Sequence, residues 1–200
     1  MKLFYSPASP YVRKVVACAI ARDIDRQIER LPTNPHASPP DLLAANPLSK
    51  VPCLVTEDGL ALFDSPVICE YLDSVGVAAP LFPPTGGARL RALKYQAMAD
   101  GILDAAVLRR MEAQRPAEDA RSAAAARQKD AVARTLAALE VDPPHPSVDI
   151  GSISVACALG YLDFRFDHEP WRSNCPRLAA WFAEFATEPC IADTVPREAR

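Results

Sequence analysis

Apolar and polar positions follow two different patterns along this chain of 200 residues. Up to Gly76, short apolar runs that suit β-strands alternate with stretches whose apolar side chains recur at the spacing of one helix face. From Ala88 onward only the helical spacing recurs. The pattern therefore predicts a mixed α/β first half and an all-helical second half.

The first half is predicted to fold in the order strand, helix, strand, helix, strand, strand, helix. Its strands are expected at residues 2–5, 27–31, 51–56 and 60–63, and its helices at 10–22, 41–45 and 66–75. Pro10 and Pro66 stand at the start of two of these helices, where proline fits the first turn. Asp58-Gly59 favours a tight antiparallel reversal between the last two strands. The proline-rich run 32–40 predicts an irregular loop.

A change of composition separates the two halves. The segment from Val77 to Gly87 contains three prolines and two glycines, a composition that cannot continue a helix. We therefore expect a first domain at residues 1–77, a linker at 78–87 and a helical second domain at 88–200. Helices of the second domain are expected at 88–113, 116–139, 150–162 and 176–187. Asp149 and Ser152 suit a cap at the third of these helices.

Composition and charge are typical of an ordinary soluble globular protein, with 50% apolar residues, 24% charged residues and a formal net charge of −3. The arginines are dispersed among acidic residues, so we expect no nucleic-acid partner. No stretch approaches the roughly 20 apolar residues of a membrane span, and Met1-Lys2 leads directly into a strand pattern without a secretion signal. We expect a cytoplasmic protein with no membrane partner.

Six cysteines occur without a Cys-x-x-Cys pair and without a histidine at metal-ligand spacing, so we expect no metal site. Cys18, Cys69 and Cys157 lie within helical apolar patterns, which predicts reduced and buried thiols. Cys53 differs from these three because it follows Pro52 at the start of a predicted strand.

Three short motifs carry the candidate chemistry: Ser9-Pro10-Tyr11 opens the first helix, Val51-Pro52 enters the third strand, and Asp64-Ser65 opens the third helix. They supply a hydroxyl donor at a positive helix end, a strand start with unpaired backbone groups, and a second polar helix start. Each motif alone also fits a plainer interpretation, in which the polar residues only cap helices and the proline is trans. In combination, the motifs predict a pocket for a small peptide-like anion with a thiol.

These residues resemble cytosolic glutathione S-transferases. The stretch "LFYSPASPYVRKV" is similar to the first strand and helix of the bacterial serine-type and plant tau-type enzymes, "NPLSKVPCL" to their cis-proline loop, and "LFDSPVICEYL" to their glutamyl-binding turn. The stretch "DIGSISVACALGYLDFRF" resembles the central helix of their second domain. The resemblance implies a thioredoxin-like N-terminal domain, an all-helical C-terminal domain, a homodimer, and detoxification chemistry with glutathione as co-substrate and no metal.

The resemblance implies that Ser9 faces the sulfur of glutathione, with Ser6 as a rival for that role. Tyr5 resembles the tyrosine of other classes only in residue type, and its place in the strand pattern favours burial. The peptide bond between Val51 and Pro52 is implied to be cis, which turns the Val51 backbone toward the cysteinyl unit of the ligand.

Asp64 and Ser65 are implied to hold the ammonium and carboxylate of the γ-glutamyl end, although most relatives have glutamate where this chain has Asp64. Lys50 either approaches a ligand carboxylate or is simply solvated. His36 lies in the loop where related enzymes hold the glycyl carboxylate, and a contact there is a further expectation.

The implied reaction is attack of the glutathione thiolate on a hydrophobic electrophile or a peroxide in a cleft between the domains. Helices within 95–112 are expected to wall the acceptor site, with Ile102, Leu103 and Val107 lining it. Asp100 resembles a residue that reaches the partner subunit's ligand in some classes, or is a solvated aspartate. Two alternatives stay open: a non-catalytic binding or regulatory protein, and a glutathione-dependent disulfide or peroxide reductase with Cys53 as local nucleophile.

Overall fold

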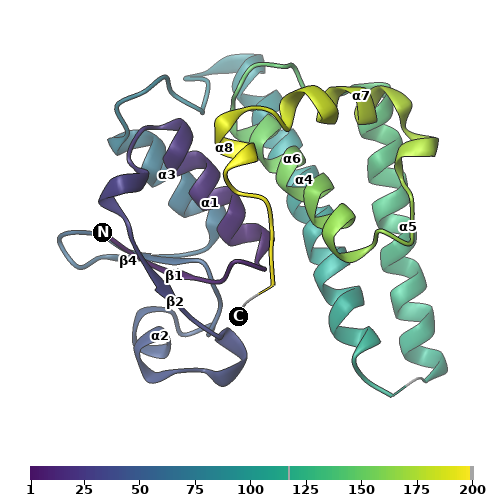
Figure 1. Cartoon of the computed structure of the whole chain (residues 1–200), viewed down its shortest axis with the longest axis horizontal. Helices are drawn as coiled ribbons and strands as arrows, with labels where there is room; N and C mark the ends of the chain where they lie inside the picture. Colours follow the sequence, from purple (N-terminus) through teal and green to yellow (C-terminus); the bar gives the residue numbers. More distant parts are fainter. Residues whose placement is uncertain (117, 199–200) are drawn as a thin grey trace.

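The computed structural model describes residues 1–116 and 118–198, which form two adjoining halves (Figure 1). The first half is built on a sheet with the strand order β2-β1-β3-β4. Its strands are β1 (Lys2–Tyr5), β2 (Glu29–Pro32), β3 (Cys53–Val55) and β4 (Ala61–Leu62). β2 runs parallel to β1, whereas β3 is antiparallel to both β1 and β4. The mixed sheet belongs to a thioredoxin-like first half, as expected.

Helices cover both faces of this sheet. They are α1 (Pro10–Ala21), α2 (Pro40–Ala45) and α3 (Ser65–Val75). Successive side chains of a strand point to opposite faces. Accordingly, Leu3 and Leu54 belong to the core that includes α1 and α3, while Phe4 and Cys53 pack with Leu42 of α2. The central strands are therefore buried on both sides.

The second half is entirely helical among the described residues. Its helices are α4 (Gly86–Ala113), α5 (Asp119–Val141), α6 (Ile150–Arg165), α7 (Pro176–Phe185) and α8 (Pro189–Ala192). α6 is its core, because every residue from Ile150 to Leu162 is buried. The predicted cap of α6 is confirmed: Ser152 N donates to Asp149 Oδ1 at 2.8 Å, and Asp149 N donates to Ser152 Oγ at 2.9 Å.

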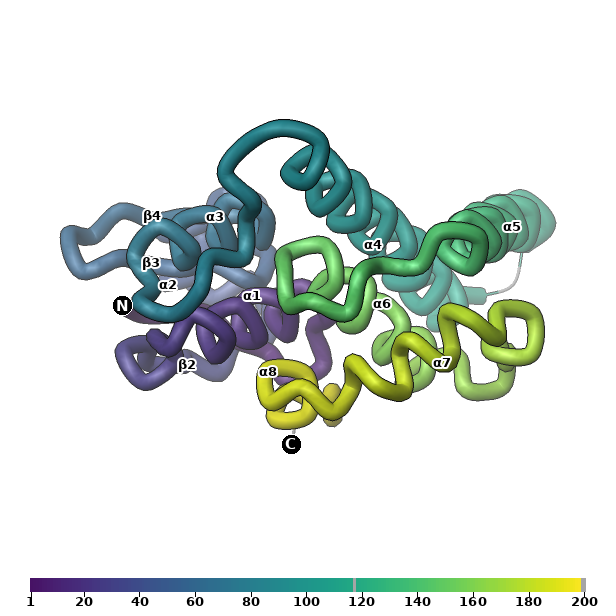
Figure 2. Tube along the Cα trace, turned by 90° about the horizontal axis from the view of Figure 1, so that it is seen from above, coloured from purple at the N-terminus to yellow at the C-terminus, as the bar shows by residue number. Residues whose placement is uncertain are grey.

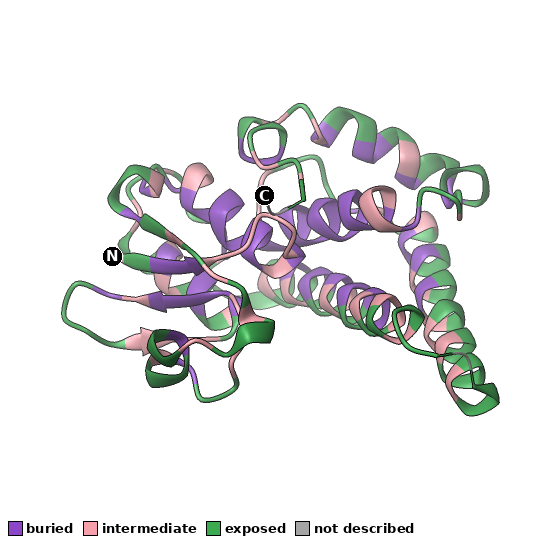
Figure 3. Cartoon of the chain, turned by 60° about the horizontal axis from the view of Figure 1, so that its bottom comes forward, coloured by how far each residue is buried: buried purple, intermediate pink, exposed green. Residues whose placement is uncertain are grey.

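α1 connects the two halves, because it packs against α3 in the first half and against α6 and α8 in the second. The buried Arg13 of α1 donates to the carbonyl of Ile191 in α8 at 3.2 Å. α8 lies beside α1 (Figure 2), and the chain beyond it returns to the first half, where Arg197 N donates to the carbonyl of Pro7 at 3.4 Å. Buried positions gather along this junction, whereas much of α5 is exposed (Figure 3).

Most predicted elements are present, with shifted ends. The hairpin at Asp58-Gly59 is confirmed: Thr56 N donates to the carbonyl of Leu60 at 2.9 Å, and Gly59 has a φ of 88°. Its strands are shorter than expected, in part because Pro52 has no N–H to donate to a neighbouring strand. The sequence does not predict α8, since an element this short shows no periodicity.

Residues 117 and 199–200, which fall within the predicted second domain, lie outside the described residues. All six cysteines are free and buried, so the expectation for Cys18, Cys69 and Cys157 is confirmed. None of the helices in the described ranges has both the length and the apolar character needed to cross a bilayer.

Candidate functional site

The register of the sheet brings four loops to one edge. At the end of β1, Phe4 pairs with Cys53, the first residue of β3. Leu62, the last residue of β4, pairs with Leu54 of β3, and β2 runs parallel to β1 and ends beside it. The segments after β1, β2 and β4 therefore lie near the segment before β3. These segments contain Ser6, Ser9, His36, Lys50, Val51, Pro52, Asp64 and Ser65.

Ser9 is the N-cap of α1, and its Oγ accepts a hydrogen bond from Val12 N at 3.3 Å. Because the oxygen acts as acceptor in this bond, the hydroxyl hydrogen is left to donate elsewhere. Ser6 is the first residue of the same turn, and its carbonyl accepts from Ser9 N at 3.1 Å. The capping interpretation of Ser9 is thus correct, and the capping hydrogen bond leaves the hydroxyl hydrogen of Ser9 available as a donor.

The peptide bond between Val51 and Pro52 is cis. The loop before it is fixed by Asn46, a buried residue whose Nδ2 donates to the carbonyl of Lys50 at 2.9 Å and whose Oδ1 accepts from Leu48 N at 3.0 Å. Sequence reasoning missed this positioning role of Asn46, although an Asn-Pro step at Asn46 is a turn signal. Val51 is half-buried and Lys50 is exposed.

Asp64 is the N-cap residue of α3, but its side chain makes no capping hydrogen bond. Its backbone carbonyl accepts from Ile68 N at 3.1 Å, and the peptide bond between Phe63 and Asp64 is cis. The side chain of Asp64 is exposed, whereas Ser65, the first residue of α3, is buried. The plain capping interpretation therefore does not account for the Asp64 carboxylate.

His36 lies in a short 3₁₀ helix, Pro35–Ala37, and is exposed. Its backbone N–H donates to Asn34 Oδ1 at 3.1 Å. Ser49 ties this loop to the one before Val51, because its hydroxyl donates to the carbonyl of Pro35 at 3.2 Å. His36 and Lys50 are thus carried by two loops that contact each other.

α4 faces α1 with acidic side chains. Lys14 Nζ of α1 lies 2.6 Å from Asp100 Oδ1, and the Tyr11 hydroxyl donates to the carboxylate of Asp104. Asp100 is therefore paired with Lys14 of its own chain and is not a solvated aspartate. Ile102 and Leu103 are buried in the core rather than lining a cleft, which corrects the expectation for them.

Burial and neighbouring charges shift the pKa values of Asp100 and Tyr11. Burial raises the pKa of Asp100, Lys14 opposes this effect, and the charges of Asp104 and Asp64 raise it further. Burial and the hydrogen bond to Asp104 raise the pKa of the Tyr11 hydroxyl, which stays protonated at neutral pH. Asp64 thus acts on Asp100 of α4 through its charge, whereas Tyr11 contacts α4 directly at Asp104.

Cys53 lies at the same edge but is 0% exposed. Burial raises the pKa of its thiol to about 11, so Cys53 is protonated at neutral pH and lacks the thiolate that a nucleophile requires. Within the described residues, no group of three histidine, cysteine, aspartate or glutamate side chains is arranged to hold a metal ion.

Two family models match the chain. The glutathione S-transferase N-terminal domain matches residues 8–75, and the glutathione S-transferase C-terminal domain matches residues 122–184. Among curated proteins, the uncharacterized GST-like protein YibF of Escherichia coli strain K12 is 36% identical over 205 residues, with 100% of both chains covered. A stringent starvation protein A homolog of Coxiella burnetii is 36% identical over 98 residues, which cover 48% of this chain and 46% of that protein.

Solved structures give the same assignment. A glutathione transferase family member from Pseudomonas fluorescens Pf-5 with bound glutathione is 41% identical, covers 98% of each chain and has a TM-score of 0.90. A glutathione S-transferase from Methylobacillus flagellatus KT with bound glutathione is 35% identical, with 98% of this chain and 99% of that chain covered and a TM-score of 0.88. With both halves matched by its models, the chain belongs to the glutathione S-transferase family.

Proposed function

We propose that this protein is a glutathione transferase in which the Ser9 hydroxyl donates a hydrogen bond to the sulfur of bound glutathione. The observation that carries the proposal is the convergence of the Ser9, Val51 and Asp64 loops at one edge of the sheet. Relatives at 41% and 35% identity bind glutathione, which supports the same ligand here. The thiolate then attacks an electrophilic carbon, a carbon–sulfur bond forms, and the leaving group departs with its electron pair.

The interactions at Ser9 are strong enough for this role. Lowering the pKa of a thiol by about 2 units requires roughly 2.7 kcal/mol. A hydrogen bond to a charged group contributes roughly 1.5–3 kcal/mol, and a helix N-terminus adds up to about 1 kcal/mol. The two terms together reach the required value. Ser9 acts as a donor and not as a base, because an unactivated hydroxyl is not ionised at neutral pH.

The other loops are proposed to hold the rest of the tripeptide. The backbone of Val51, just before Pro52, pairs with the cysteinyl unit. Asp64 binds the γ-glutamyl ammonium with its exposed carboxylate, and the start of α3 at Ser65 binds the α-carboxylate through helix N–H groups. These assignments use the two groups that capping leaves available, the Asp64 carboxylate and the helix N-terminus.

Lys50 and His36 are proposed to neutralise the glycyl carboxylate of glutathione. Both residues are exposed, and the bond between Ser49 and the carbonyl of Pro35 keeps their loops in contact. An exposed lysine can reach a carboxylate without the desolvation cost of burying its charge. Their contribution is therefore expected to be smaller than that of Asp64 and Ser65.

The acceptor is proposed to be a hydrophobic electrophile bound between α1 and α4. Tyr11 and the half-buried Val107 give this region an apolar surface, while Asp104 fixes the Tyr11 hydroxyl. We further propose a cytoplasmic homodimer with a role in detoxification, as in related transferases. The molecular mass in solution, measured by light scattering, tests the dimer directly.

The test compares Ser9→Ala with Ser6→Ala and Ser9→Thr. Glutathione affinity is measured by calorimetry, and the pH dependence of kcat/KM is measured with chlorodinitrobenzene. Ser9→Ala is expected to keep the affinity within a few fold and to raise the apparent pKa of the thiol by about 1–2 units. Ser6→Ala and Ser9→Thr are expected to keep the parent profile. Equal profiles for Ser9→Ala and the parent would show that Ser9 does not activate the sulfur.

A second candidate is a non-catalytic binding or regulatory protein of the same fold. The partial match to the stringent starvation protein A homolog of Coxiella burnetii favours this candidate, since that protein is not named for a transferase activity. Absence of glutathione binding by the wild-type protein would favour the regulatory alternative. Binding followed by turnover of the electrophile would favour the transferase.

A further inference from the structure

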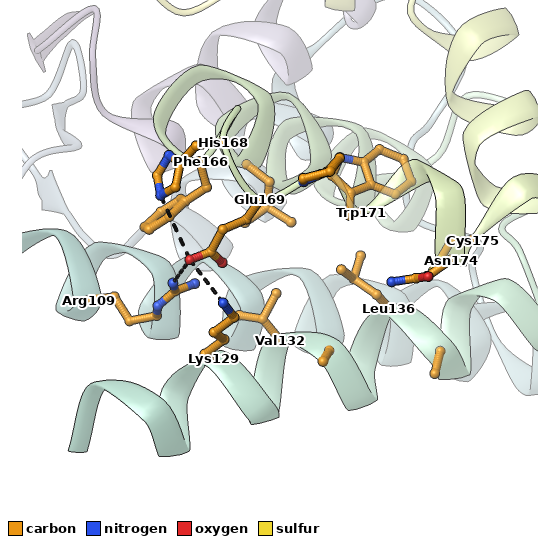
Figure 4. Close-up of a pocket in the computed structure, with 14 residues that line it drawn as sticks. Arg109, Lys129, Val132, Leu136, Phe166, His168, Glu169, Trp171, Asn174 and Cys175 are labelled. Carbon is orange, nitrogen blue, oxygen red and sulfur yellow. Dashed lines mark hydrogen bonds and ion pairs between the residues drawn. The ribbon is translucent and has the colours of Figure 1, made fainter. Parts of the chain in front are cut away.

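A second pocket lies in the helical half, with a volume of about 450 Å³ (Figure 4). This open pocket is lined by residues of α4, α5, the end of α6 and the segment that leads to α7. All of its lining residues fall between Arg109 and Cys175, so none comes from the loops of the proposed glutathione site. Ligand pockets in proteins are roughly 300–1,000 Å³, and this volume lies within that range.

One wall of the pocket carries more positive than negative charge. Arg109 Nη2 lies 2.6 Å and Lys129 Nζ 3.3 Å from the same oxygen of Glu169, Oε1. Arg109 and Lys129 thus share one carboxylate oxygen, and Figure 4 also shows His168, whose Nε2 lies 3.8 Å from the same oxygen. Each cation retains N–H groups that Glu169 does not use, because a guanidinium has five donors and an ammonium has three.

The geometry at this wall is partly fixed in advance. The Arg109 side chain is 11% exposed, and its guanidinium lies 4.4 Å from the centre of the Phe166 ring. An arginine stacked on an aromatic face loses little freedom when it receives a second acceptor. Lys129, at 57% exposure, can move to meet a ligand. The pocket therefore has one rigid and one mobile donor for an anion.

Apart from His168 and Asn174, the remaining lining of the pocket is mainly apolar. Its lining includes Val132, Leu136, Leu162 and Trp171. A pair of cations above an apolar floor suits a ligand with an acidic group at one end and a ring or short chain at the other. A purely structural ion pair would require no open apolar volume beside it. We propose that this pocket binds an aromatic or aliphatic monocarboxylate, with the carboxylate on Arg109 and Lys129 and the apolar body against Leu136 and Trp171.

The probe for this proposal is naphthalene-2-carboxylate, and its uncharged carboxamide is the control ligand. Binding to the full chain is measured by calorimetry with and without saturating glutathione. The carboxylate is expected to bind at least about tenfold more tightly than the carboxamide, since a charge-assisted hydrogen bond corresponds to roughly ten- to hundredfold in affinity. Glutathione is expected to leave its affinity unchanged, because the two sites share no residue.

Two pairs of variants locate the binding site. Lys129→Gln is expected to weaken binding about tenfold, whereas Lys94→Gln, at an equally exposed lysine of α4 outside the pocket, leaves it within about twofold. Ala133→Phe places a large side chain at an exposed position of the pocket lining and is expected to weaken binding about tenfold. Its control is Ala138→Phe, at an exposed position on the same helix but outside the lining.

Three results would overturn the proposal: no carboxylate binding, displacement of the probe by glutathione, or equal effects of the pocket and control variants. None of these results affects the proposed transferase function, which is measured at Ser9. If the protein conjugates glutathione but does not bind naphthalene-2-carboxylate, only the proposal of a carboxylate site in the helical half is refuted.

Discussion

The ion pair between Lys14 and Asp100 joins α1 to α4, and removing one of its partners should destabilise the protein strongly. The Lys14 side chain is 0% exposed and that of Asp100 is 21% exposed. In Asp100→Asn, the ammonium of Lys14 stays buried without a carboxylate. Loss of one partner of a buried pair costs about 3–5 kcal/mol, so the free energy of unfolding is expected to fall by about that amount.

The double variant Lys14→Met/Asp100→Asn should be more stable than Asp100→Asn alone. Methionine has nearly the length of lysine and carries no charge, so the double variant has no uncompensated charge in the core. Burial and the charges of Asp104 and Asp64 raise the pKa of Asp100 although Lys14 opposes them, so the carboxylate is not held in a purely favourable environment. We therefore expect the second substitution to restore about 2 kcal/mol.

The assay is urea-induced unfolding of the parent, both single variants and the double variant at one pH. Asp25→Asn is the matched control, because Asp25 pairs with Arg30 at the surface with side-chain exposures of 30% and 37%. This control should change the free energy of unfolding by less than about 1 kcal/mol. Additive effects of Lys14→Met and Asp100→Asn would refute the reasoning, since they would show that the pair is not energetically coupled.

Two further predictions concern the edge of the sheet that carries the proposed glutathione site. Cys53, with a pKa of about 11, should react with iodoacetamide at neutral pH roughly 100-fold more slowly than the same cysteine in the unfolded chain. Its reaction rate should rise about tenfold for each pH unit until the pH reaches that pKa. Mass spectrometry of the labelled peptide measures this rate, and labelling as fast as in urea would contradict the assignment. Asn46→Ala removes two hydrogen bonds, each worth about 0.5–1.5 kcal/mol, and should raise the KM for glutathione more than it lowers kcat. Steady-state kinetics decide this, and an unchanged KM would exclude a positioning role for Asn46.

Local signals in the sequence predicted much of the first half. Pro10 and Pro66 predict the starts of α1 and α3 to within one residue. Asp58-Gly59 predicts the tight turn between the last two strands, because this turn type is specified by two adjacent residues. The ends of β3 and β4 were not predictable, because they depend on which backbone groups Pro52 leaves unpaired. α8 was not predicted, because four residues are too few to show a helical period.

The candidate site was predictable only in part, for a related reason. Ser9, Val51 and Asp64 each follow or precede a strand, so strand order and register suffice to bring their loops together. The contact between Lys14 and Asp100 spans 86 residues and depends on the packing of α1 against the helical half. No local pattern contains that information. The same limit explains why Ile102 and Leu103 were wrongly expected to line the cleft.

α4 contributes side chains both to the proposed acceptor site and to the proposed carboxylate pocket. Asp100 and Asp104 are four residues apart and therefore lie on one face, where they contact Lys14 and Tyr11 of α1. Arg109 follows Asp104 by five residues, which corresponds to a rotation of roughly 140° around the helix. Its side chain consequently meets Glu169 on another side. Substitutions on one face of α4 should then alter one of the two proposed ligand sites without affecting the other, so that the proposed acceptor binding and the proposed carboxylate binding can vary independently.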